Sequence, residues 1–202
     1  MALFHTALKV RQLFDYDTWT YTYLVWDERT KEAAIIDSVR EQKDRDLQLI
    51  KELGLSLKYC METHVHADHI TASGPIREAT GSKIVLHKNS HVACADHLAV
   101  EGDIFRLGDQ GIEILHTPGH TDNDITFRID GALFTGDTML VRDCGRTIGE
   151  ERAYNVRVAN ERSFNEFKEM MDNLNLPNPK RIHISVPGNQ KCGMVTDAEA
   201  TI

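Results

Sequence analysis

One short run of metal-binding side chains constrains this sequence more than any other feature. Residues 63–69 (THVHADH) bring three imidazoles and one carboxylate into seven residues, directly after an apolar run at 57–61 that is typical of a buried strand. Alternate side chains of an extended segment face the same side, so His64, His66 and Asp68 can converge on one point. Such ligands suit zinc, iron or manganese. The fold must therefore bring further ligands to the end of this strand.

Two later turns offer those ligands. His120 lies in residues 116–121 (HTPGHT), where proline and glycine predict a tight turn after a strand. Asp137 lies in residues 134–138 (FTGDT), again just after a strand and a glycine. A single turn histidine is usually a surface residue, but three strand-end loops with such side chains together indicate a metal enzyme. His116 is interpreted as a strand-end residue, not as a ligand.

Short β-rich runs bounded by turn residues predict most of the secondary structure. The predicted strands are residues 18–25, 33–36, 57–61, 83–87, 112–116, 125–129 and 132–135, the last two joined by the hairpin signal Asp130-Gly131. Helical spacing predicts a helix within residues 39–53, with Ser38 and Glu41 as a capping box and Gly54 at its end. A second helix is predicted over residues 163–174 behind Ser163, and residues 181–184 look strand-like.

Composition limits the classes of function. A chain of 202 residues with 41% hydrophobic residues fits one domain, and a net charge of −8 argues against a nucleic-acid surface. The four cysteines are widely spaced, which predicts reduced thiols, with Cys60, Cys94 and Cys192 as small buried apolar groups. No targeting segment and no membrane-length apolar run is recognised. We therefore expect a protein of the bacterial cytoplasm or, in a eukaryote, the mitochondrial matrix, with no membrane partner.

The motifs resemble those of the metallo-β-lactamase superfamily, and more specifically the persulfide dioxygenases, the family of the ethylmalonic encephalopathy protein. The resemblance rests on residues 63–71 (THVHADHIT), 116–122 (HTPGHTD), 134–137 (FTGD), 144–147 (CGRT) and 186–193 (VPGNQKCG), which span most of the chain. It implies an α+β fold, an αββα sandwich of two packed mixed sheets flanked by helices. It also implies one metallo-β-lactamase-like domain over residues 1–202, and a homodimer.

The resemblance further implies a mononuclear iron(II) centre with His64, His120 and Asp137 as metal ligands and catalytic groups. Such a centre would oxidise glutathione persulfide with O2 to sulfite and glutathione, one iron being bound per chain. His66, Asp68 and His69 would then orient the ligands and hold water. The alternative is a glyoxalase II-like thioester hydrolase, in which these three residues, with one late histidine, help to bind two metal ions. Spacing alone does not separate these two uses.

Substrate contacts are also implied by the resemblance. Arg157 matches an arginine that binds glutathione, although valine replaces the family's proline before it, and a guanidinium suits a carboxylate partner. Arg146 is interpreted as supporting the site, and Thr121, next to His120, as a substrate contact. The chain departs from the family between Thr147 and Ile148, where a segment of several tens of residues is missing. Either the segment is left out of the given sequence or it is truly deleted, and we favour the first explanation, because a fold that lost a core strand would expose the neighbouring strand. That segment would carry the late histidine and a tyrosine that binds glutathione.

The loss of the late histidine weakens the two-metal hydrolase more than the one-metal dioxygenase. His183 is a weak replacement and is interpreted as a structural or surface residue, and His5, His87, His91 and His97 as surface residues. A third hypothesis is a non-catalytic metal-binding or redox-sensing module, which would require the missing segment to be a true deletion.

Overall fold

The computed structural model describes residues 8–139, 162–173 and 177–200. The chain divides into two compact units, one of residues 1–138 and 179–202 and one of residues 139–178. In the smaller unit the described helix is α4 (Phe164–Asp172), and its Ser163–Glu166 capping box confirms the predicted cap. No helix within the described ranges is long and apolar enough to cross a bilayer. All the candidate metal ligands lie in the larger unit.

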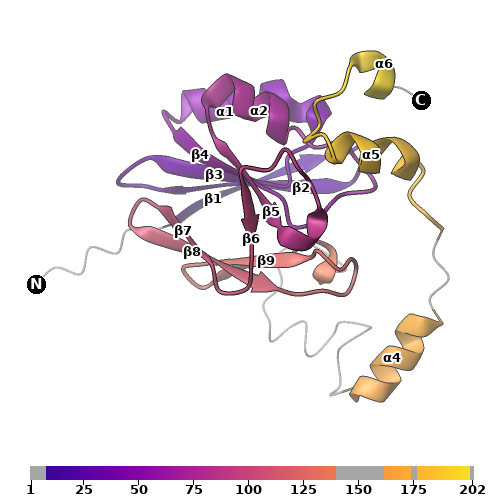
Figure 1. The fold of residues 1–202 in the computed structure, drawn as a ribbon. Helices are drawn as coiled ribbons and strands as arrows, with labels where there is room; N and C mark the ends of the chain where they lie inside the picture. The colour runs from indigo at the N-terminus through magenta and orange to yellow at the C-terminus, as the bar shows by residue number, and fades with distance from the viewer. Residues whose placement is uncertain (1–7, 140–161, 174–176, 201–202) are drawn as a thin grey trace, which may run out of the picture. The chain divides into compact units, whose positions relative to one another are not determined.

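The larger unit contains two sheets with helices beside them (Figure 1). The six-stranded sheet has the order β1 (Leu8–Asp15), β2 (Thr20–Asp27), β3 (Glu32–Ile36), β4 (Ser56–Met61), β5 (Lys83–His87) and β6 (His97–Ala99). The four-stranded sheet has the order β10 (Ala132–Phe134), β9 (Ile125–Ile129), β8 (Gln110–His116) and β7 (Ile104–Leu107). The predicted class of two packed sheets flanked by helices is confirmed.

The two sheets differ in how their described strands pair. β1, β2 and β3 pair antiparallel, and β3 to β6 pair parallel. Parallel strands need crossover connections, which α1 (Lys43–Glu52) and α2 (Ser73–Thr80) provide on the upper face in Figure 1. The described strands of the second sheet pair antiparallel throughout, because each follows its neighbour in the chain. Over the described residues, the first sheet is therefore mixed, as expected, and the second is antiparallel.

Alternation along the strands builds two apolar layers. Ile35, Cys60 and Ile84 face the helices, whereas their neighbours Ile36, Met61 and Val85 face the second sheet. Buried side chains of that sheet complete the inner layer: Ile112, Ile114, Ile125, Phe127 and Ile129. Each central strand is buried on both faces, so its position is fixed, and the loop that follows it has a rigid support.

Two local predictions are wrong. The Ser38–Glu41 capping box does not form, because the backbone of residues 38–40 pairs with residues 70–72, and the helix begins only after a 3-10 turn, η1 (Arg40–Gln42). The predicted end at Gly54 is confirmed by its positive φ of 64°. Residues 181–184 belong not to a strand but to helix α5 (Ile182–Asn189), which is followed by α6 (Asp197–Ala200). The reason is tertiary: α5 buries Ser185, Gly188 and Asn189.

Candidate metal centre

Three loops bring His64, His120 and Asp137 together, as the sequence predicts. One ligand atom from each of them lies within 4.8 Å of the others. His64 follows β4 of the first sheet, whereas His120 follows β8 and Asp137 follows β10 of the second. The His64 and His120 rings are 5.1 Å apart between centroids, and His120 Nε2 is 3.5 Å from Asp137 Oδ2. The group therefore spans both sheets at one edge of the sandwich.

His64 is held from behind by a hydrogen-bonded chain. Thr63 donates its hydroxyl to Asp37 Oδ2 (2.9 Å), so its oxygen is left to accept a hydrogen bond from His64 Nδ1, 3.0 Å away. This arrangement places the His64 proton on Nδ1 and leaves the lone pair of Nε2 for a metal ion. Burial, helped by the neighbouring imidazoles of His66 and His120, lowers the pKa of His64 well below its usual value. A buried neutral imidazole is the form that binds metals.

The His120 turn is closed by Asp124. This buried carboxylate accepts both the backbone N–H and the hydroxyl of Thr121, each at 2.7 Å. Gly119 adds a backbone bond to the Thr121 carbonyl at 3.0 Å. The His120 side chain itself is 45% exposed. The buried carboxylate of Asp124 thus fixes the backbone of the turn, while the imidazole of His120 remains partly exposed to solvent.

Asp137 lies in a short 3-10 turn, η3 (Gly136–Thr138). Thr138 in this turn and Thr117 before the His120 turn place their hydroxyl oxygens 3.1 Å apart, which ties the two segments together. Partial removal from water raises the pKa of the Asp137 carboxyl, and the negative charges of Asp68 and Asp37 add to this rise. The imidazoles of His66 and His120 only partly oppose it. A bound cation would relieve this unfavourable environment.

The remaining residues of the histidine cluster form a second group beside the first. His66, Asp68 and His69 also offer ligand atoms within 4.8 Å of one another. Asp68 Oδ1 is 3.2 Å from His69 Nδ1, and the hydroxyl of Thr20 lies 3.3 Å from both Asp68 Oδ2 and His69 Nδ1. The His69 bond and the charges of His69 and His66 overcome burial and lower the pKa of Asp68.

His66 is tied to two buried carboxylates. Its Nε2 lies 3.1 Å from Asp37 Oδ1 and 3.3 Å from Glu62 Oε2. Burial alone would disfavour the imidazolium, but the charge and hydrogen bond of Asp37, followed by those of Glu62, outweigh it and raise the pKa of His66 well above its usual value. Asp37 therefore supports both halves of the cluster, His64 through Thr63 and His66 directly.

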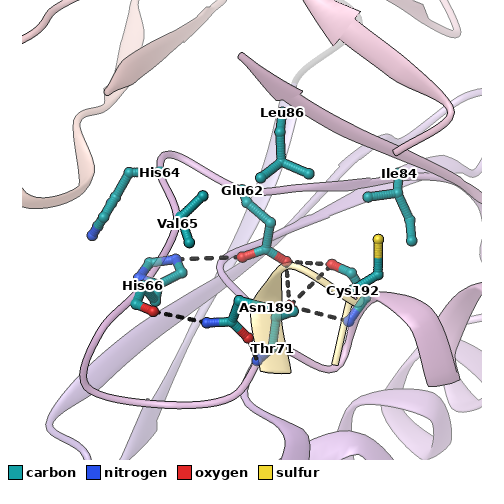
Figure 2. A pocket seen from close by; sticks show the side chains of 10 residues that line it. Glu62, His64, Val65, His66, Thr71, Ile84, Leu86, Asn189 and Cys192 are labelled. Atoms are coloured by element: carbon teal, nitrogen blue, oxygen red, sulfur yellow. Dashed lines mark hydrogen bonds and ion pairs between the residues drawn. The ribbon is translucent and has the colours of Figure 1, made fainter. Parts of the chain in front are cut away.

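Figure 2 shows a small cavity behind His64 and His66. It is lined by the polar residues Glu62, Thr71, Ser73 and Asn189 and by the apolar residues Val65, Ile84 and Leu86 together with Cys192. Glu62 Oε1 accepts hydrogen bonds from the hydroxyls of Thr71 and Ser73. The volume open to the centre of a water molecule is about 10 Å³, roughly the space that one water needs. The cavity is too small for a substrate. Its walls pack behind the histidine cluster and support it.

Sequence reasoning missed the residues that hold the cluster: Asp37, Glu62, Asn123 and Asn189. Asp37 carries a usable signal, because it follows β3 directly and so lies at the same sheet edge as the histidines. Asn123 accepts from the Val65 backbone at 2.9 Å, and Asn189 contacts the backbone of His66 and His69. Asn123 lies in a loop with no local sequence signal, and Asn189 lies within the 186–193 motif, which by itself gave this residue no role.

The other candidate residues have varied outcomes. Arg146, Arg157 and Cys144, like His5, lie outside the described residues. The Thr121 hydroxyl hydrogen is used on Asp124, so this oxygen could meet a substrate only as an acceptor. His183 is exposed on α5 and belongs to none of the ligand groups found among the described residues. His91 and His97 are exposed as expected.

The interpretation of His87 as a surface residue is wrong. It is buried at the end of β5, and its ring stacks on His116 with a centroid distance of 4.0 Å. Removal from water, and the neighbouring His116, lower the pKa of His87. His116 is a strand-end residue, as predicted, and its Nε2 lies 3.1 Å from the carbonyl of Asp122.

The prediction of reduced cysteines is wrong for one pair. Cys94 and Cys192 form a disulfide, with their Cα atoms 6.2 Å apart and a sequence separation of 98. The sequence could not indicate this pairing, because the bond depends on the C-terminal segment folding back over α2. Cys60 is free and buried, as predicted, and burial raises the pKa of its thiol to about 12.

Comparisons with known proteins show the family and the fold of the chain. The model of the metallo-beta-lactamase superfamily matches residues 20–185. The mitochondrial persulfide dioxygenase ETHE1 of Mus musculus is 38% identical over 230 aligned positions, which cover 93% of this chain and 89% of that protein. Because 230 positions exceed the 202 residues of this chain, parts of the mouse protein have no counterpart here.

Two further relatives help to rank the alternatives. The crystal structure of ETHE1 from Myxococcus xanthus is 41% identical, with a TM-score of 0.86, and the match covers 92% of this chain and 99% of that one. A hydroxyacylglutathione hydrolase of Chelativorans is 35% identical over 127 residues, which cover only 61% of this chain and 49% of that enzyme.

Proposed function

The chain belongs to the persulfide dioxygenase family of the metallo-beta-lactamase superfamily, and we propose that it oxidises glutathione persulfide with O2 at one iron(II) ion. The observation that carries the proposal is the convergence of His64, His120 and Asp137 from both sheets. In the reaction, the persulfide, O2 and one water give glutathione, sulfite and two protons. The outer sulfur is oxidised and dioxygen is reduced, with no further reductant.

The residues present fit an iron(II) ion. Two imidazoles and one carboxylate are the donor set typical of non-haem iron oxygenases. His64 has its lone pair free on Nε2, and a bound cation would offset the burial that raises the pKa of the Asp137 carboxyl. When bound, iron(II) would supply neighbouring coordination positions for the persulfide sulfur and for O2.

The chain's own residues then perform three tasks. The Thr63–Asp37 bond fixes the His64 tautomer, and Asp124 fixes the His120 turn. The exposed sides of His120 and Asp137, 45% and 44% open, border the direction from which a substrate can approach. His66, Asp68 and His69 form a polar wall beside the ligands, where they can hold water and the protons that the reaction releases. Positioning is thus the protein's main contribution.

The alternative is the two-metal thioester hydrolase. His66, Asp68 and His69 are close enough to offer a second metal site. That site would lack its late histidine, because the described histidine of the C-terminal part, His183, is exposed on α5 and outside the ligand groups. The similarity to the hydrolase is also partial, whereas the similarity to the dioxygenases spans nearly the full length. Both observations favour the dioxygenase.

The deciding experiment combines metal analysis with oxygen uptake. We expect about one iron per purified chain and oxygen consumption with glutathione persulfide, both lost in His120→Ala. His183→Ala is the matched control and should keep both. Two zinc ions per chain, with oxygen-independent turnover of a glutathione thioester, would establish the hydrolase instead. Metal binding without turnover of either substrate would indicate a binding or redox-sensing module.

The glutathione part of the substrate is proposed to meet Arg157, with Arg146 supporting the site and Thr121 as an acceptor. Arg157→Ala should raise the KM for glutathione persulfide much more than it lowers kcat, because a carboxylate contact serves binding. An unchanged KM would remove Arg157 from the site.

A homodimer, and a bacterial cytoplasmic or mitochondrial matrix location, remain part of the proposal. Sedimentation of the purified protein tests the first of these.

A further inference from the structure

We infer that Asn189, at the end of helix α5, is a positioning residue for the loop that carries the histidine cluster. The inference rests on the proposed metal centre but not on the dioxygenase reaction. Asn189 is more than 110 residues from this loop in sequence, and its amide oxygen already accepts a hydrogen bond from the Thr71 backbone, so we assign it no ligand role. It acts through the backbone of the residues that surround the metal.

The Asn189 amide bonds the loop at three points. Its Nδ2 donates to the carbonyls of His66 and His69, each at 2.9 Å, and its Oδ1 accepts from the Thr71 amide at 2.8 Å. Figure 2 shows the amide directed at this loop. The side chain is buried, with 5% of its surface exposed. Both N–H donors and the oxygen of the Asn189 amide are therefore used, and all three bonds go to the segment 66–71.

The loop needs this support because it is irregular. Residues 62–70 form neither helix nor strand, so their backbone groups lack the regular partners of secondary structure. Two inward-facing carbonyls, those of His66 and His69, both bond Asn189. The side chains between these carbonyls include Asp68, and His64 lies just before them. Closing this turn sets the distances among the imidazoles, whose centroids are 4.2 Å apart for His64–His66 and 4.3 Å for His66–His69.

Asn189 is itself held by contacts of the C-terminal segment that follows it. The Cys192 amide donates to the Asn189 carbonyl, the Cys192 carbonyl accepts from the Gly74 amide at 2.8 Å, and the disulfide joins Cys192 to Cys94. Gly193, with φ 72°, lies so close to Thr71 that an added Cβ would overlap the Thr71 carbonyl oxygen. These contacts do not involve metal ligands. The supports of the Asn189 amide are therefore independent of the proposed metal ligands.

Hydrogen–deuterium exchange of the metal-free protein tests the inference directly. In Asn189→Ala we expect the backbone amides of residues 63–71 to exchange at least tenfold faster, while the strands keep their protection. Ser185→Ala is the matched control: Ser185 is buried on the same helix, and its hydroxyl has no hydrogen-bond partner among the described residues. It should exchange like the parent. Cobalt(II) titration should show roughly 10–100-fold weaker binding in Asn189→Ala, with an altered visible spectrum.

Asn189→Asp separates positioning from a general loss of stability. This nearly isosteric variant keeps the acceptor for Thr71 but loses both donors, so Thr71 should stay protected while the amides around His66 and His69 exchange faster. Parent-like loop exchange and cobalt affinity in a folded variant would overturn the inference, and so would an equal rise in exchange across the whole unit. Because exchange is measured without metal or substrate, these outcomes do not depend on which reaction the enzyme performs.

Discussion

The α-carbon of Gly136 lies directly against the side chain of Thr63. An added Cβ at Gly136 would be 2.6 Å from the Thr63 Cβ, closer than real side chains approach, and Gly136 has a left-handed φ of 48°. Gly136 precedes Asp137 and Thr63 precedes His64, so this contact joins two of the three ligand segments. The separation of two proposed ligands therefore depends on the absence of a side chain.

Gly136→Ala should damage both stability and metal binding. The left-handed backbone costs alanine about 1–2 kcal/mol and the overlap adds to this, so we expect a loss of roughly 2–4 kcal/mol in the free energy of unfolding. Metal content should fall with it. Gly119→Ala is the control, because Gly119 precedes His120 but faces open space, and it should change stability by about 0.5 kcal/mol or less. Urea unfolding and metal analysis measure both effects, and equal losses in the two variants would contradict the explanation.

Thr63→Val should weaken metal binding with little change in shape. The variant removes the hydroxyl that joins Asp37 to His64 Nδ1, so the tautomer with its lone pair on Nε2 loses its partner. We expect roughly 10–100-fold weaker metal affinity. Thr63→Ser keeps the hydroxyl and should remain within a few-fold of the parent. If the serine variant were as weak as the valine variant, packing rather than hydrogen bonding would be the cause.

Asp46 should make the fold less stable as the pH rises. Burial raises its pKa to about 6, although Arg45 opposes the shift, and the usual value is 3.8. Between about pH 4 and 6 the unfolded state ionises this carboxyl more readily than the folded state, so stability falls through this window and stays lower above it. Asp46→Asn should therefore be more stable than the parent at pH 7 by roughly 2–4 kcal/mol, with little difference below about pH 4.

The control for this prediction is Asp44→Asn on the same helix, where the side chain is 91% exposed. It should show no such dependence on pH. Denaturant unfolding across the pH range measures all three proteins. A constant difference between Asp46→Asn and the parent at every pH would indicate that ionisation is not the cause.

The Cys94–Cys192 bond should contribute measurable stability. It closes a loop of 98 residues, and loss of such a bond costs about 2–4 kcal/mol. In buffer without reductant, Cys94→Ser should therefore unfold at a lower denaturant concentration than the parent protein with its disulfide formed. In excess dithiol the two proteins should become nearly equal. Peptide mapping without reduction provides the independent check, and failure to find the linked peptides would refute the prediction.

Much of the fold could be predicted because the central strands are buried on both faces. Runs such as residues 33–36 and 83–87 are short, apolar and bounded by turn residues, and they form β3 and β5. Strand β1 was missed because its residues are mostly exposed at the sheet edge, so its pattern is weak. The helix α5 was missed because Ile182 and Ile184 favour strands locally, and only burial against the histidine loop reverses this preference.

In the candidate site, too, some residues could be predicted from the sequence and others could not. His64, His120 and Asp137 could be predicted because each lies in a loop directly after a strand, and the packing of the two sheets then brings these loops together at one edge of the sandwich. Asn189 could not, because its partners are backbone carbonyls that any residue could supply. Hydrogen bonds to the backbone leave no matching pattern in the sequence of the partner. Such supports become visible only when the chain's path is known.

The distribution of the proposed ligands over both sheets has a consequence for the life of the protein in the cell. A metal ion held by His64 from one sheet and by His120 and Asp137 from the other would cross-link the two layers. Binding then adds to stability, by about 2.7 kcal/mol when free metal is 100 times its Kd. Shortage of this metal would increase the fraction of unfolded chains open to proteases. The abundance of the protein would then follow the supply of the metal with no change in its synthesis.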